Sequence, residues 1–158
     1  MNRAVLVCHC LLDPLTRAEG TKEIKRDIIK TLIDSDISLI QLPCPEMRYG
    51  FFSPSSSKED YDTVEYRNHC KRLAEEIGRT VKEYENAGFD IFGLISVGGS
   101  PSCGFMRTHV GGVDVREPGV FIEELQKILR KRNIRLKICD HELLEDRKER
   151  EQFLLPEK

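Results

Sequence analysis

Three of the six cysteines lie in short motifs that could carry chemistry. Cys10 begins a Cys-Leu-Leu run, Cys44 begins a Cys-Pro-Glu run, and Cys103 lies within Ser-Pro-Ser-Cys-Gly. Thiolates are soft ligands that suit iron–sulfur clusters, and three of them would leave one iron of a cubane without a protein ligand. An open coordination position is what distinguishes a catalytic metal site from a structural one.

Polar residues beside these cysteines add candidates for acid–base and hydrogen-bonding roles. Glu46 follows Cys44 by two positions and could act as a nearby acid or base, although a carboxylate after a proline also commonly caps a helix. Ser100 and Ser102 could donate hydrogen bonds to a bound anion. The remaining cysteines are expected to be structural, because free cysteine is among the most buried residue types: Cys8, Cys70 and Cys139.

The elements that position these residues follow from the apolar pattern. Short apolar runs predict strands at 3–8, 37–42, 89–97 and 134–139, and helical spacing predicts helices at 21–33, 61–86, 120–132 and 141–153. This alternation predicts an α/β fold: a single Rossmann-like three-layer domain over residues 1–158, with a short, mainly parallel sheet of about four strands. Carboxyl ends of parallel strands share one rim, so Cys10, Cys44 and Cys103 should converge there and ligate one group.

The segment after the second predicted strand is expected to be irregular. Pro43 and Pro45 are taken to exclude both continued sheet and an immediate helix. The run from 47 to 57, with its glycine, aromatic residues and serines, is predicted to be a loop that could cover a pocket.

Composition narrows the class of protein. The chain has 158 residues with 25 basic and 27 acidic side chains, a net charge of −2 that favours neither nucleic-acid nor membrane binding. The N-terminal apolar run is too short for a signal peptide or a membrane span, so we expect a cytoplasmic protein with reduced thiols. No Cys-x-x-Cys pair occurs, which argues against a zinc ribbon.

The three motifs, in this order and at strand ends, resemble those of the thiouracil desulfidase family. The resemblance implies a [4Fe-4S] cluster bound by Cys10, Cys44 and Cys103, with one iron free to bind the sulfur of a thiolated substrate. It also implies that Glu46 is the acid or base and that Ser100 assists. The implied reaction replaces the sulfur of a thiolated pyrimidine or related small molecule with oxygen from water and releases sulfide.

Two segments depart from the family pattern. Asp13-Pro14 follows Cys-Leu-Leu where the family has a glycine and a second cysteine, and Met47-Arg48-Tyr49-Gly50 follows Glu46 in place of a Gly-Gly-Leu stretch. These segments are expected to shape the substrate pocket, so the sequence leaves the exact thiolated substrate open. The number of subunits is open as well, with a homodimer as one option.

Two other functions are compatible with the residues. One is a non-catalytic α/β module that binds a small molecule or nucleotide at its strand ends, with incidental thiols. The other is an enzyme that uses Cys103 as nucleophile, with His9 or His109 as its base.

Overall fold

The computed structural model describes residues 2–17, 23–50 and 57–156. Six strands lie within these ranges: β1 (Arg3–Val7), β2 (Ser38–Gln41), β3 (Asp90–Ser96), β4 (Thr108–Val110), β5 (Val113–Val115) and β6 (Lys137–Asp140). The α-helices there are α1 (His9–Leu12), α2 (Asp27–Asp34), α3 (Pro45–Tyr49), α4 (Val64–Asn86), α5 (Val120–Lys131) and α6 (Arg147–Leu154). Three 3₁₀ turns accompany them: η1 (Pro14–Thr16), η2 (Lys58–Asp60) and η3 (His141–Glu145).

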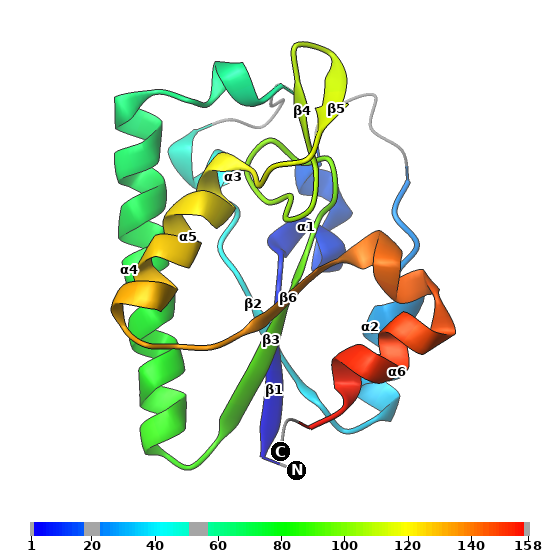
Figure 1. Ribbon diagram of the computed structural model, residues 1–158. Coiled ribbons are helices and arrows are strands. Elements are labelled where there is room, and N and C mark those ends of the chain that lie inside the picture. The colour runs from blue at the N-terminus through cyan, green and yellow to red at the C-terminus, as the bar shows by residue number, and fades with distance from the viewer. Residues whose placement is uncertain (1, 18–22, 51–56, 157–158) are drawn as a thin grey trace.

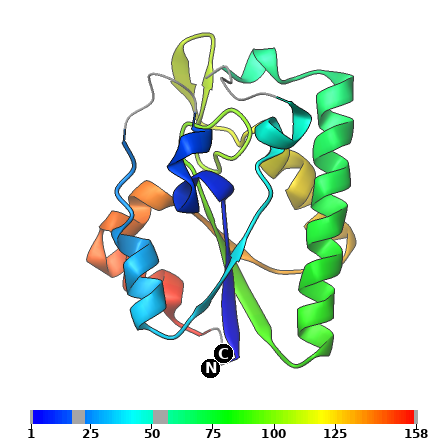
Figure 2. The ribbon, with the colours of Figure 1, turned by 180° about the vertical axis from the view of Figure 1, so that it is seen from behind.

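Four of the strands form one parallel sheet in the order β2-β1-β3-β6. Helices α4 and α5 cover one face, and α2 and α6 lie on the other (Figures 1 and 2). The predicted three-layer α/β fold with a four-stranded parallel sheet is therefore confirmed. No helix in the described ranges combines the length and apolar character that a membrane span requires.

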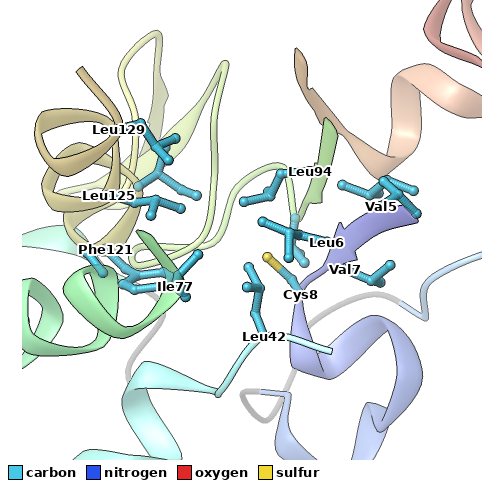
Figure 3. Close-up of a cluster of buried hydrophobic side chains, with 14 of the residues drawn as sticks. Val5, Leu6, Val7, Cys8, Leu42, Ile77, Leu94, Phe121, Leu125 and Leu129 are labelled. Carbon is cyan, nitrogen blue, oxygen red and sulfur yellow. The ribbon is translucent and has the colours of Figure 1, made fainter. Parts of the chain in front are cut away.

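The core lies between the sheet and its helices. Cys8 is 1% exposed and its sulfur lies among apolar side chains that include Leu6 and Leu42 (Figure 3). Cys70 is fully buried on α4, whereas Cys139 is half-buried on the edge strand β6. The expectation that Cys8 and Cys70 are core residues is confirmed.

Several sequence predictions about local structure were wrong. Helix α3 begins at Pro45 itself, because proline at the first helical position loses only an N–H that has no helical partner there. The loop after Cys103 contains an antiparallel hairpin, β4–β5, whose tight turn is made by two glycines with positive φ. The predicted C-terminal helix is divided at Asp146, which caps α6 by accepting from the N–H of Glu149.

The predicted loop at 47–57 is only partly described. Its first residues belong to α3, whose last residue is Tyr49 and whose C-cap is Gly50 with φ of 109°. Residues 51–56, on which the idea of a covering loop depends, lie outside the described residues. Residues 21 and 22 of the predicted first helix also lie outside them, and α2 begins at Asp27.

Candidate functional site

The carboxyl ends of three adjacent strands lie level with one another. Val7, the last residue of β1, pairs with Gln41 at the end of β2 and with Ile95 near the end of β3. Cys10 lies in the helical turn directly after β1, and Cys44 lies three residues after β2. The topology thus places two of the predicted ligands at one rim of the sheet, as the sequence predicted.

Cys103 returns to the same rim although it lies seven residues beyond β3. The loop folds back, because the N–H of Val97 donates to the carbonyl of Cys103 at 3.1 Å. The hydroxyl of Ser100 accepts a hydrogen bond from the N–H of Cys103 at 3.0 Å, and Gly104 N–H donates to the carbonyl of Ser100. A compact turn therefore holds the third cysteine beside the strand end.

Cys44 is fixed by the helix that follows it. It is the N-cap of α3, and its Sγ accepts a hydrogen bond from the N–H of Met47 at 3.5 Å. The carbonyl of Pro45, in the first turn, accepts from Nε2 of His69 on α4 at 2.8 Å. Helix α4 thereby holds the Cys-Pro-Glu turn against the body of the protein.

The pKa of each of the three thiols is raised, and Cys103 contributes to the rise at both Cys10 and Cys44. Burial raises the pKa of Cys10, and the neighbouring thiols of Cys103 and Cys44 raise it further. Burial also raises the pKa of Cys44 to about 11, again with a contribution from Cys103. The pKa of Cys103 is raised by a hydrogen bond with Cys8, by burial and by Glu46.

Glu46 is the buried carboxyl group of this site. Only 8% of the residue is exposed, and burial raises its pKa to about 7 against the opposing effect of a hydrogen bond from Ser102. The carboxyl group also raises the pKa of all three cysteines, so it lies within electrostatic reach of each. A carboxyl group with such a pKa can both hold and release a proton near neutral pH.

The two serines of the third motif have different roles. Ser100 caps the turn at Cys103 and lowers the pKa of that thiol through its hydroxyl. Ser102, which is 1% exposed, donates to Oε1 of Glu46 at 3.0 Å. Its Oγ also lies 2.7 Å from the hydroxyl of Tyr66. Tyr66, on α4, is a site residue that the sequence interpretation missed.

The two histidines considered as bases contact carboxylates instead. Nε2 of His9 lies 3.2 Å from Asp13, and Nδ1 of His9 lies 2.9 Å from the amide nitrogen of Gln41. Nδ1 of His109 lies 3.0 Å from Asp114 across the β4–β5 hairpin. Neither contact pairs an imidazole with Cys103, so the structure offers the cysteine-nucleophile alternative no additional support.

The donor set at the rim consists of thiols, which are soft ligands typical of iron–sulfur clusters. Among the described residues, no three histidine, cysteine, aspartate or glutamate side chains converge as they would around one ion. Thiolates that bind separate irons of a cubane are spaced more widely, about 6–7 Å apart. Cys10, Cys44 and Cys103 bring three thiol groups to one rim with the Glu46 carboxyl beside them, a donor set of the kind that iron–sulfur clusters use.

Fold and rim together define an α/β protein whose strand ends carry a cysteine-rich site. The chain matches the family described as "Putative 2-thiouracil desulfurase" over residues 2–151. The chain belongs to this family, and the resemblance found in its motifs is confirmed.

Two further proteins are similar to this chain. An uncharacterized protein of Methanocaldococcus jannaschii is 32% identical over 147 residues, which cover 89% of this chain and 86% of that protein. The solved structure of the [4Fe-4S]-dependent thiouracil desulfidase TudS has a TM-score of 0.58 and 22% identity, covering 90% of this chain and 93% of that one. The structural likeness supports the fold.

Proposed function

We propose that this protein is a [4Fe-4S]-dependent desulfidase that replaces the sulfur of a thiolated pyrimidine or related small molecule with oxygen from water. The observation that carries the proposal is that Cys10, Cys44 and Cys103 follow adjacent paired strands at one rim of the sheet, with Glu46 in electrostatic reach of each. Membership of the desulfurase family and the fold shared with TudS support it. The reaction is hydrolytic: water supplies oxygen, and sulfur leaves as hydrogen sulfide.

The cysteines would hold the cluster as three thiolate ligands. When bound, the cluster would supply a Lewis-acidic iron that binds the substrate's sulfur and makes the adjacent ring carbon electrophilic. A bound cluster would hold these cysteines as thiolates although burial raises the pKa of each thiol.

Glu46 and Ser100 would supply the remaining chemistry. The Glu46 carboxyl would protonate a ring nitrogen or accept a proton from the attacking water, and its burial excludes bulk solvent from that exchange. Ser100 accepts from the N–H of Cys103, and its hydroxyl, which lowers the pKa of the Cys103 thiol, would donate its proton to sulfur at the site.

Anaerobic reconstitution followed by iron and sulfide analysis tests the proposal. The wild-type protein should gain about four irons per chain and release sulfide from 2-thiouracil or another thiolated base or nucleoside. Cys10→Ser, Cys44→Ser and Cys103→Ser should each lose most of the iron. Cys139→Ala is the matched control, because its thiol neighbours Asp140 and Glu149 and lies on the edge strand.

Two results would contradict the proposal. One is a wild-type protein that takes up no iron under these conditions. The other is full iron content in all three cysteine variants. Ligand binding that is unaffected by these replacements would instead favour the non-catalytic binding module.

A further inference from the structure

A chain of buried hydroxyl groups ends on the carboxyl group of Glu46. The hydroxyl of Tyr66 lies 2.7 Å from Oγ of Ser102, which donates to Oε1 of Glu46 at 3.0 Å. These residues come from α4, the loop after β3, and α3 respectively. All three are buried, with exposed fractions of 1%, 1% and 8%.

We infer that Tyr66 and Ser102 are positioning residues for Glu46, fixing its carboxyl group through Oε1 and leaving Oε2 as the oxygen that acts on substrate. This inference rests on the proposed desulfidase function. It separates the roles of the two serines of the motif. Ser100 accepts a hydrogen bond from the backbone of Cys103, and Ser102 donates one to the carboxyl group of Glu46.

The direction of the hydrogen bonds follows from the groups involved. Burial raises the pKa of Tyr66 far above its usual value, so its hydroxyl retains its proton and can donate to Ser102. Ser102 has a single proton, which it then directs to Oε1 of Glu46. Oε2 accepts no hydrogen bond from the described residues.

Tyr66 is itself held in place, as a positioning residue requires. Its ring lies 5.1 Å from the rings of both Tyr49 and Tyr61, and its N–H donates to Oγ1 of Thr63, the N-cap of α4. Helix α3 has only five residues and few internal hydrogen bonds, so Glu46 depends on contacts from outside the helix. The Tyr66–Ser102 pair supplies such a contact.

Steady-state kinetics of sulfide release from 2-thiouracil provide the first test. Ser102→Ala should lower kcat about 10-fold to 100-fold, with KM and iron content unchanged, as expected for loss of a supporting hydrogen bond. Tyr66→Phe should lower kcat by about 10-fold. Ser102→Thr, which retains a hydroxyl, should recover part of the loss. Because Tyr66 acts through Ser102, the double variant should equal Ser102→Ala alone.

Infrared spectroscopy of the cluster-free protein provides a readout that does not depend on activity. The carboxyl stretching band of protonated Glu46 is assigned by its disappearance in the Glu46→Gln variant. Ser102→Ala should shift this band to higher frequency because the oxygen loses its donor, and Tyr66→Phe should shift it less. Tyr84→Phe is the matched control: it removes a hydroxyl from the same helix about 27 Å further along.

The outcomes separate the two proposals. An unshifted Glu46 band in Ser102→Ala, or additive losses of kcat in the double variant, would overturn the positioning role. A shifted band in cluster-free Ser102→Ala, together with a reconstituted wild-type protein that releases no sulfide, would support the hydrogen-bond chain and contradict the desulfidase proposal.

Discussion

The hydroxyl of Ser96 donates to Oδ1 of Asp140 at 2.7 Å, which joins the last residue of β3 to the last residue of β6. The same carboxylate accepts from the N–H groups of Phe105 and Met106 at 2.9 and 2.8 Å. Asp140 is 1% exposed. A buried carboxylate at the rim therefore orders the loop that follows Cys103.

Replacing this carboxylate should weaken both the fold and the third cysteine turn. Asp140→Asn places an amide N–H₂ where one oxygen now accepts, leaving at least one buried donor unpaired. We expect a loss of about 2–3 kcal/mol in the free energy of unfolding, measured in urea. Asp34→Asn, at an exposed position on α2, is the control and should change stability little. Equal stability of the two variants would contradict this role for Asp140.

Gly119 allows close packing against the Ser-Pro-Ser-Cys turn. A Cβ at this position would lie 2.5 Å from the carbonyl carbon of Ser102 and 2.7 Å from the carbonyl oxygen of Pro101. These are backbone atoms, so Gly119→Ala should displace the turn and cost about 1–3 kcal/mol of stability. Gly111→Ala is the comparison, because a Cβ there meets open space and only its φ of 59° is unfavourable. Thermal unfolding should show that Gly119→Ala is less stable than Gly111→Ala. The opposite ranking of the two variants would contradict the prediction.

The Arg107–Glu142 ion pair should contribute stability that depends on pH. The guanidinium donates to both carboxylate oxygens at 2.8 and 2.9 Å and lowers the pKa of Glu142. The pKa of Glu142 is lower in the folded protein than in the unfolded chain. The ion pair therefore contributes its full stability at pH values above the unfolded-state pKa. This stability is lost as the pH falls through the folded-state pKa. The pair is partly exposed, so its contribution is under about 1 kcal/mol.

The measurement compares wild type with Glu142→Gln. The difference in Tm should be present at pH 7 and should shrink below about pH 4.5, the usual value for glutamate. Glu46 is present in both proteins, so its titration cancels in the difference. A Tm difference that grows as the pH falls would contradict the sign.

Cys8 should be dispensable for cluster binding even though it contacts Cys103. Its thiol is 1% exposed and lies in the apolar core, whereas Cys10 lies in the turn at the rim. Cys8→Ala should retain the iron content of the wild type and lose about 1–2 kcal/mol of stability. Iron analysis after reconstitution, beside Cys10→Ala, checks this expectation. Equal iron loss in the two variants would identify Cys8 as a ligand.

Strand periodicity and apolar runs were sufficient to predict the sheet. Each predicted strand overlaps an observed one, and the carboxyl rim followed from parallel pairing alone. The hairpin β4–β5 was missed because its strands have only three residues each, too few to show alternation. The α3 helix was missed because proline was treated as a barrier at a position where it is favourable.

Tyr66 could have been found from its spacing. The buried side chains of α4 recur at helical intervals: Tyr66, Cys70, Leu73, Ile77 and Val81. Spacing alone would not have shown that the Tyr66 hydroxyl reaches Ser102. That contact depends on how α4 packs beside the rim, which is a property of the tertiary structure.

The placement of Cys10, Cys44 and Cys103 on three different strand ends has a consequence for biosynthesis. A ribosome exposes the first two thiols well before β3 has been made, and the rim does not exist until β3 pairs with β1. On the proposed ligand set, all three cysteines reach the rim only after the turn at Cys103 has been made and β3 has paired with β1. Unfolding that separates β3 from β1 would therefore part the proposed ligands.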